Sequence, residues 1–327
     1  MCGGNDGLAQ ICDKFSGLGG EARFWQACTL DQPVNGLSID WPAADELMRK
    51  AIVGSVLGVL AAVAAVYLAA LGYLWATQRS HVFHPGIGPL DLINSTVASY
   101  MREQDIRTSD GLVLMSWYAP AKPGRRTIVY FHGNAGTLGD RHERVLAYLE
   151  RGFGVLLVGY RGYGGNPGAP TESGLYADGR AHLDWLASQG LRPDDLVFYG
   201  ESLGAAVATQ MATERKAAAL VLEAPFASVL LSARARYPLF AFDWVIKDKF
   251  ANIDKIDQIN MPLFVIHGAL DRVTPQRFGR MVFQRAREPK AASWPSGAGH
   301  NDLLQFGMVE AVTRFLDGLD APISKAG

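Results

Sequence analysis

The chain has 327 residues, 49% of them hydrophobic, which is enough for one large domain and an appended segment. Its formal net charge is −1 and no basic cluster is interleaved with aromatic residues, which argues against nucleic-acid binding. The three cysteines, Cys2, Cys12 and Cys28, lie near the N-terminus in a spacing that matches no zinc site, so the body of the chain has no thiol for a disulfide, a metal or catalysis.

The first 47 residues are rich in Gly, Asp and Asn and show no hydrophobic periodicity. We therefore expect residues 1–47 to form a weakly structured leader. Met48 is followed by two cations, Arg49 and Lys50, and then by a long apolar run, which is the form of a signal-anchor N-terminus. Met48 is thus an alternative start site, and residues 1–47 are then an over-extended gene model.

The run from Ala51 to Ala76 contains 26 residues and no charge. As a helix it is about 39 Å long, whereas the hydrocarbon core of a bilayer is about 30 Å thick. We expect residues 48–79 to form a single transmembrane anchor, with residues 51–76 in the lipid. A cleavable signal peptide is the main alternative, but its apolar core is only about 7–15 residues long. A buried core helix is less consistent with a helix that is apolar on every side.

The charges that flank the apolar run indicate an orientation. Arg49 and Lys50 precede it, whereas Arg79 is the nearest cation after it. The positive-inside rule therefore predicts a cytoplasmic N-terminus and an extracytoplasmic catalytic domain. Tyr73 and Trp75, near the far end, are typical of residues at a membrane interface.

The remainder of the chain, residues 80–320, alternates short apolar runs with helical patterns, which predicts a mostly parallel sheet with helices on both faces. A turn-rich linker, residues 84–89, comes first, and Ser109-Asp110-Gly111 predicts a hairpin turn. In chain order we expect strands near 104–108, 112–118, 127–131, 154–159, 196–199, 220–222 and 262–266, with helices near 140–151, 174–189 and 205–211.

Ser202 stands at the corner of a predicted strand, turn and helix, within Gly-Glu-Ser-Leu-Gly at residues 200–204. A serine in such a turn exposes its hydroxyl at the end of the sheet, and the two glycines let other backbone segments pass closely. The pentapeptide alone is a weak signal in a glycine-rich chain. Its context of strand and helix predicts a nucleophile elbow.

A serine nucleophile needs a histidine base and an acid that orients the base. Asp271 follows the strand at 262–266, and His300 lies in a Gly-rich loop after the short run 291–294. Both positions lie beyond the ends of predicted strands, where ligands bind in α/β sheets. The order serine, acid, histidine is that of a nucleophile-elbow triad. Glu223 is the alternative acid, and Asp271 could instead cap the following helix.

Two backbone amides are candidates for an oxyanion hole. Asn134 lies in the loop after the strand at 127–131, and Leu203 directly follows the nucleophile. The glycine-rich loop at 161–168 lacks the Lys-Ser/Thr ending of a phosphate-binding loop, so we expect no nucleotide site there. We also expect that the protein needs no metal or other cofactor.

These motifs together resemble the α/β-hydrolase superfamily, and more narrowly the branch of alpha/beta hydrolase domain-containing proteins 13 and 17 with their bacterial relatives. The resemblance implies the α/β-hydrolase fold over residues 80–320. Members of the 13 type are similar in having one N-terminal membrane anchor, and members of the 17 type are protein depalmitoylases, although their N-terminal cysteine cluster is absent here. Gly159 departs from the family, which commonly has an acid there. The motifs that carry this resemblance are at residues 132–136, 160–164, 175–178, 200–204, 267–271 and 299–300.

Between the strand that ends at Glu223 and the one that starts at Pro262, residues 226–256 predict a small helical cap. A short apolar lid beside a membrane anchor favours a hydrophobic acyl group. The same side chains are equally compatible with the core of the domain. They are Leu230, Leu231, Tyr237, Leu239, Phe240, Phe242, Trp244 and Phe250.

We therefore expect a membrane-anchored serine hydrolase that cleaves an ester or thioester through an acyl-enzyme. Ser202 is the expected nucleophile, His300 the base, Asp271 the orienting acid, and the amides of Asn134 and Leu203 the oxyanion donors. The expected partners are an acyl substrate and the lipid bilayer. A catalytically silent partner-binding protein and a serine peptidase remain the alternatives, because the same fold occurs without activity and the same elbow occurs in peptidases.

Overall fold

The computed structural model describes residues 41–86, 88, 92, 95–240 and 243–319. Most of the expected leader, with Cys2, Cys12 and Cys28, therefore lies outside the described residues, as does Phe242. Contacts within the chain divide it into two units, residues 1–66 and 67–327. The second unit includes the last turns of the first described helix together with the whole sheet.

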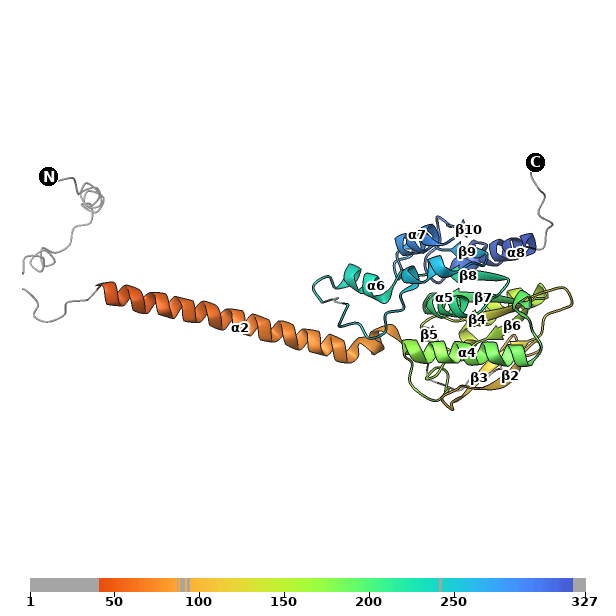
Figure 1. Cartoon of the computed structure of the whole chain (residues 1–327), viewed down its shortest axis with the longest axis horizontal. Helices are drawn as coiled ribbons and strands as arrows, with labels where there is room; N and C mark the ends of the chain where they lie inside the picture. The colour runs from red at the N-terminus through yellow and green to blue at the C-terminus, as the bar shows by residue number, and fades with distance from the viewer. Residues whose placement is uncertain (1–40, 87, 89–91, 93–94, 241–242, 320–327) are drawn as a thin grey trace, which may run out of the picture. The chain divides into compact units, whose positions relative to one another are not determined.

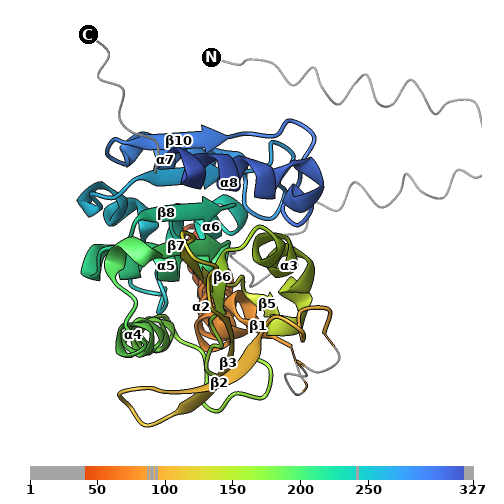
Figure 2. The same cartoon turned by 90° about the vertical axis from the view of Figure 1, so that its right-hand side faces the viewer.

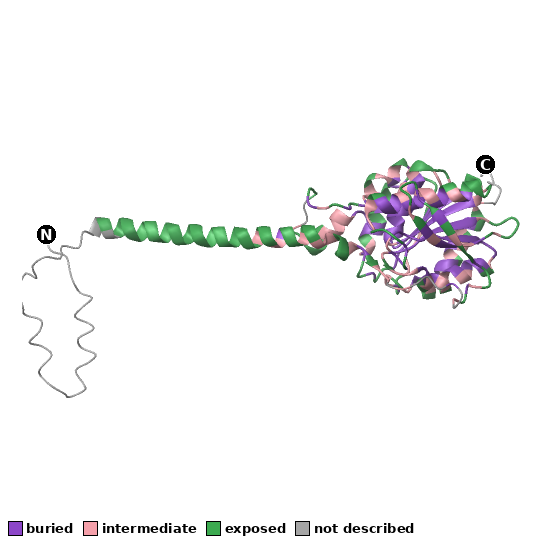
Figure 3. Cartoon of the chain, turned by 90° about the horizontal axis from the view of Figure 1, so that it is seen from below, coloured by how far each residue is buried: buried purple, intermediate pink, exposed green. Residues whose placement is uncertain are grey.

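Helix α2 (Trp41–Val82) contains the apolar run in which we expect the membrane anchor. Its segment from Asp45 to Val82 is long and apolar enough to cross a membrane. The large apolar side chains from Leu47 to Leu68 are more than half exposed, as the green ribbon of α2 in Figure 3 shows. A buried core helix would hide such side chains, so that alternative does not fit this structure.

The described part of the second unit has one eight-stranded sheet, in the order β10-β9-β8-β7-β4-β6-β3-β2 (Figure 1). The pairs β2/β3 and β3/β6 are antiparallel, and the other neighbours are parallel. The strands are β2 (Arg102–Arg107), β3 (Val113–Ala119), β4 (Thr127–Phe131), β6 (Gly154–Leu157), β7 (Leu196–Glu201), β8 (Ala219–Glu223), β9 (Leu263–Ile266) and β10 (Lys290–Ser293). A separate parallel pair joins β1 (His84–Pro85) to β5 (Ala135–Gly136).

Helices cover both faces of the sheet (Figure 2). One face packs against α4 (Glu172–Ser188), α5 (Leu203–Glu214) and α7 (Gln276–Arg285), and the other against α3 (His142–Glu150) and α8 (Met308–Gly318). Alternation along the strands supplies both cores, since Val129 and Phe131 of β4 face one layer while Ile128 and Tyr130 face the other. Short 3₁₀ turns span Leu138–Arg141, Pro193–Asp195, Asn252–Asp254, Ile256–Gln258 and Leu303–Phe306.

This architecture confirms the expected fold, and the differences in element bounds have local reasons. The helix expected from Asp140 begins at His142, because a 3₁₀ turn precedes it. At Gly159 a Cβ atom would collide with the carbonyl oxygen of Met115, and the Gly159 N–H donates to Ser116 Oγ at 2.9 Å. The acid that the family commonly has at this position would not fit here.

The segment 226–256, the predicted cap, contains one short helix, α6 (Val229–Arg236), followed by turns. The sequence left open whether the apolar side chains of this segment form a lid or belong to the core of the domain, and the structure contains side chains of both kinds. Phe250 is fully buried and belongs to the core, whereas Leu239 and Trp244 are 70% and 74% exposed.

Candidate active site

Ser202 connects β7 to α5 with a backbone φ of 51° and ψ of −110°. Such a conformation is strained for a residue with a side chain and occurs mostly at functional sites. The Ser202 N–H donates to the carbonyl oxygen of Glu223 at 2.8 Å, which fixes the turn against the neighbouring strand. The sequence thus folds locally as the predicted elbow.

The two glycines of the elbow are required by close packing. A Cβ atom on Gly204 would collide with the carbonyl oxygen of Phe131, at the end of β4. A Cβ atom on Gly200 would collide with the backbone of Ala205 in α5. The helix can therefore begin directly over the sheet only because both positions lack a side chain.

The structure brings Ser202, His300 and Asp271 together in a chain of contacts, from three segments far apart in the sequence. His300 Nε2 lies 3.1 Å from Ser202 Oγ, and His300 Nδ1 lies 2.6 Å from Asp271 Oδ2. If Nδ1–H donates to the carboxylate, Nε2 is free to accept the serine proton. The arrangement has the geometry of a nucleophile, a base and an orienting acid.

Asp271 is buried and receives several further hydrogen bonds. Its Oδ1 accepts from the N–H groups of Val273 and Thr274 at 2.9 and 2.7 Å, so it also caps the following turn. His267 Nε2 lies 3.1 Å from Oδ2. Burial raises the pKa of the Asp271 carboxyl, but the hydrogen bonds from His267 and His300 outweigh it and hold the pKa well below its usual range. The carboxylate is therefore ionised at neutral pH.

Glu223, the alternative acid, lies elsewhere in the site. It is fully buried, and its carboxylate accepts a hydrogen bond from Tyr199 Oη at 2.7 Å. Arg144 Nη2 lies 3.3 Å from its Oε1. Asp271, and not Glu223, is the carboxylate that contacts His300 Nδ1 in this structure.

The two candidate oxyanion amides flank the elbow. Leu203 is the first residue of α5, where a backbone N–H has no acceptor within the helix. Asn134 follows β4, which pairs with β7, and the loop at His132 packs against Gly204. The Asn134 carbonyl accepts from His84 N and Tyr163 Oη, both at 2.9 Å. These bonds fix the direction of the Asn134 carbonyl group.

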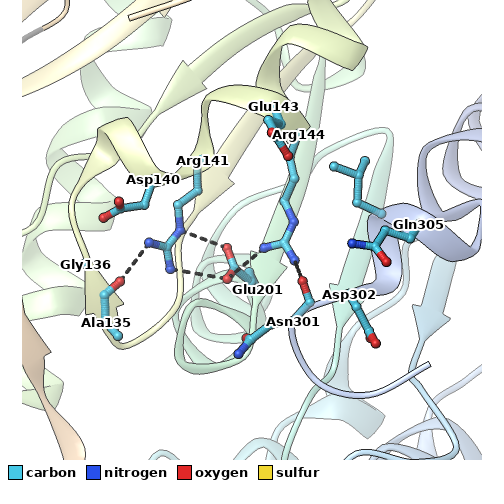
Figure 4. Close-up of a pocket in the computed structure, with 11 residues that line it drawn as sticks. Ala135, Gly136, Asp140, Arg141, Glu143, Arg144, Glu201, Asn301, Asp302 and Gln305 are labelled. Carbon is cyan, nitrogen blue, oxygen red and sulfur yellow. Dashed lines mark hydrogen bonds and ion pairs between the residues drawn. The ribbon is translucent and has the colours of Figure 1, made fainter.

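A buried charged network next to the triad was not anticipated from the sequence (Figure 4). Glu201, which directly precedes the nucleophile, contacts Arg141 Nε at 3.2 Å and Arg144 Nη1 at 3.1 Å, and it accepts from Tyr130 Oη at 2.9 Å. Burial raises the Glu201 pKa, but the two guanidinium charges outweigh it and lower the pKa from 4.5 to about 2.

The two arginines connect Glu201 to the loops that carry the other site residues. Arg141 Nη1 donates to the carbonyl oxygen of Ala135, next to Asn134, at 2.7 Å. Arg144 Nη2 donates to the carbonyl oxygen of Asn301, next to His300, at 3.0 Å. One carboxylate thus links three segments of the site. The sequence signal was the spacing of two arginines three residues apart, one in the 3₁₀ turn before α3 and one in the first turn of α3.

These side chains line a polar cavity of about 400 Å³. The other residues that line it are Ala135, Gly136, Asp140, Glu143, Asn301, Asp302, Leu304 and Gln305. Within the described residues no group of three or more His, Cys, Asp or Glu side chains is placed to bind a metal ion. Our expectation that no cofactor is needed stays a prediction.

Comparison with known sequences agrees with this fold. A family described as "alpha/beta hydrolase fold" matches residues 126–252. An uncharacterized protein of Mycobacterium tuberculosis is 38% identical over 266 residues, which cover 80% of this chain and 94% of that protein. Human alpha/beta hydrolase domain-containing protein 17B is 33% identical over 216 residues, covering 64% of this chain and 73% of that protein.

Solved structures show the same fold at lower sequence identity. An esterase of Pyrococcus furiosus superposes with a TM-score of 0.59 at 21% identity, covering 72% of this chain and 97% of the esterase. An esterase of a Rhodococcus species gives a TM-score of 0.52 at 18% identity, covering 67% and 99%.

Proposed function

Since the chain belongs to the α/β-hydrolase superfamily, in the branch that includes domain-containing protein 17B, we propose that it is a membrane-anchored serine hydrolase of carboxylic esters or thioesters. The observation that carries the proposal is the contact chain from Ser202 Oγ through His300 to Asp271, at 3.1 and 2.6 Å. The strained backbone of Ser202 supports it, because such strain is maintained where function requires it.

In the proposed mechanism, His300 Nε2 takes the proton of Ser202 Oγ as that oxygen attacks the carbonyl carbon of the substrate. Asp271 keeps Nδ1 protonated and stabilises the imidazolium that forms. The N–H groups of Asn134 and Leu203 donate to the developing oxyanion. The tetrahedral intermediate collapses as His300 gives its proton to the departing alcohol or thiol. Water, activated by His300, then attacks the acyl-enzyme and releases the acid.

The proposed substrate has an acyl or lipid-like group. The esterases among the structural neighbours support an ester. The proposal includes a thioester because acyl-enzyme formation is common to both. Residues 48–79 serve as the membrane anchor in this proposal, with residues 51–76 in the lipid, residues 80–320 as the hydrolase domain and residues 226–256 as its cap.

The proposed orientation has the N-terminus in the cytoplasm. All three cysteines precede the anchor, so they report directly on it. A membrane-impermeant maleimide should leave the wild-type protein unlabelled in intact cells and label a variant with Ser188→Cys, since Ser188 is exposed on α4. Labelling of the wild type with none at position 188 would reverse the orientation.

The test of the chemistry is labelling of the detergent-solubilised full chain with a fluorophosphonate, beside Ser202→Ala. We expect labelling of the wild type and of the matched control Ser188→Ala, and none of Ser202→Ala. Competition with acyl esters and thioesters of graded chain length then ranks the substrates. Folded wild-type protein that is not labelled would indicate a silent partner-binding protein, and release of N-terminal peptides from substrates would indicate a peptidase.

A further inference from the structure

The last turns of α2 pack against the cap segment 226–256. Tyr67 Oη donates to the carbonyl oxygen of Leu239 at 2.7 Å, and the Tyr67 ring stacks on Phe240 with centroids 5.2 Å apart. Lys247 Nζ lies 3.5 Å above the ring of Trp75. These contacts belong to the unit that contains the sheet. This end of the helix is therefore part of the catalytic unit as well as the end of the proposed anchor.

Two polar residues of α2 bind the cap segment, Gln78 at the cap backbone and Arg79 at a cap side chain. Gln78 Nε2 donates to the carbonyl oxygen of Val245 at 3.0 Å, and Gln78 Oε1 accepts from Lys247 N at 2.7 Å. Arg79 Nε pairs with the buried carboxylate of Asp248 at 2.8 Å. Because both ends of the Gln78 amide are satisfied, the side chain presents little polar surface to its other neighbours.

A groove of about 100 Å³ lies between α2 and the cap. Leu74, Gln78 and Val82 follow one another at intervals of four residues, so they form one face of α2 about 12 Å long. Apolar side chains make up most of the opposite wall. The residues that line the groove are Leu74, Gln78, His81, Val82, Val229, Ala233, Tyr237, Phe240, Val245 and Ile246.

A residue that lines the groove is hydrogen-bonded to the candidate oxyanion loop. Asn134 Nδ2 donates to the carbonyl oxygen of Val82, which lines the groove and ends α2. His84, two residues later, donates its N–H to the Asn134 carbonyl at 2.9 Å, and β1 continues this pairing with β5. The end of α2 is thus in contact with Asn134, whose backbone N–H we propose as an oxyanion donor.

We propose that this groove binds the acyl chain of the substrate, with the last turns of α2 as one wall and the cap as the other. The proposal rests on the proposed serine hydrolase function and adds the location and the chemical class of its acyl subsite. The occupant is a single unbranched acyl chain, because the groove is small and largely apolar.

One observation favours an acyl chain from a bilayer over another apolar ligand. Leu74 lies in the groove and also in the apolar run 51–76, so the groove begins within the segment that we propose as lipid-embedded. An acyl chain can then pass from lipid to groove without exposure to water, which avoids the cost of hydrating it. The polar cavity beside Glu201, by contrast, is lined by charged side chains and is unsuitable for a hydrocarbon chain.

The test is to fill the groove from each wall in the full-length protein. Ala233→Phe fills it from the cap, with Ala235→Phe on the exposed side of the same helix as its control. Leu74→Trp fills it from α2, with the exposed Ala76→Trp as its control. Each variant is assayed with an acetyl and a palmitoyl ester of the same alcohol, and fluorophosphonate labelling reports whether the protein is folded.

We expect both filling variants to lower kcat/KM for the palmitoyl ester at least about tenfold, since each methylene kept out of an apolar site weakens binding about fourfold. Turnover of the acetyl ester and the behaviour of both controls should not change. Equal losses on the two esters, or no loss on the palmitoyl ester in folded variants, would overturn the groove assignment.

A second measurement separates this proposal from the proposed function. The Ser202→Ala protein, in lipid nanodiscs, is irradiated with a palmitate that bears a diazirine, and the crosslinked peptides are identified by mass spectrometry. Crosslinks should fall in residues 74–82 and 229–246, and Ala233→Phe should abolish them while Ala235→Phe does not. This result would stand even if no ester were hydrolysed, and crosslinks confined to other segments would rule the groove out.

Discussion

The sheet end that carries Ser202 and the cap segment 226–256 are built in different ways. At the sheet end, side chains from three segments meet in a buried network, in which Glu201 is linked to Arg141 and Arg144. In the cap, Phe250 is buried, but Leu239 and Trp244 are largely exposed, and the segment makes hydrogen bonds or ion pairs with Tyr67, Gln78 and Arg79 of α2. The sheet end is therefore held together by buried charged contacts, whereas part of the cap segment exposes large apolar side chains.

The largest expected effect concerns the sheet end that carries Ser202. Asp271→Asn should lower kcat for ester hydrolysis roughly a thousand- to ten-thousand-fold, because an amide no longer orients His300 or stabilises its charged form. Steady-state turnover of a chromogenic ester measures it. Glu223→Gln serves as the comparison, and a greater loss in that variant than in Asp271→Asn would mean that the acid has been assigned to the wrong residue.

A glycine of the elbow should show the next largest effect. Gly204→Ala should lower the free energy of unfolding by at least about 3 kcal/mol, because the added methyl meets the Phe131 carbonyl at the end of a central strand that cannot move away. Gly318→Ala in α8 is the control, since its Cβ would meet no atom within 4 Å. Chemical denaturation measures both, and equal stability of the two variants would contradict the close packing of the elbow.

Removing the charge of Glu201 should destabilise the protein through the buried network. Glu201→Gln should cost about 2–3 kcal/mol at neutral pH, because Arg141 and Arg144 lose their shared anion. Glu214→Gln removes the partner of Arg180 in an exposed pair, and it should cost no more than about 1 kcal/mol. Denaturation curves of the three proteins measure the difference.

The same variant has a predicted pH dependence. The Glu201 pKa in the folded state, about 2, lies below its ordinary 4.5, so the ionised carboxylate favours folding. Its stabilisation is complete above about pH 4.5 and is lost as the pH falls toward 2. The stability gap between wild type and Glu201→Gln should therefore narrow over this interval. A gap that stays constant would show that the network does not depend on this charge.

The smallest effect is expected on the exposed side of the cap. Leu239→Ser should change the free energy of unfolding in detergent by less than about 0.5 kcal/mol, because that side chain is 70% exposed, while its backbone bond to Tyr67 remains. Fluorophosphonate labelling should also be unchanged. A loss above 1 kcal/mol would mean that the cap is packed as tightly as the sheet end.

Local patterns in the sequence were sufficient to predict the fold and to choose the residues that meet at the candidate site. The elbow at Ser202 was readable because strand, turn and helix signals occur within fifteen residues, and Asp271 and His300 each follow a predicted strand. The roles of these residues remain predictions, although their contacts fit the triad geometry. The observed start of α3 differs from the predicted one because a 3₁₀ turn and a helix have similar sequence signals at Asp140.

The sequence by itself determined the alternation of strands and helices and the apolar run 51–76, because both are patterns of residues close together in the chain. It also determined the order of serine, acid and histidine, because each of the three lies in a short motif of its own. Only the tertiary structure decided that Asp271 rather than Glu223 contacts His300, that Glu201 joins Arg141 and Arg144, and that the end of α2 borders the oxyanion loop at Asn134. These contacts join residues between 29 and 60 positions apart in the chain. The order of the strands in the sheet brings them together, and no local pattern encodes that distance.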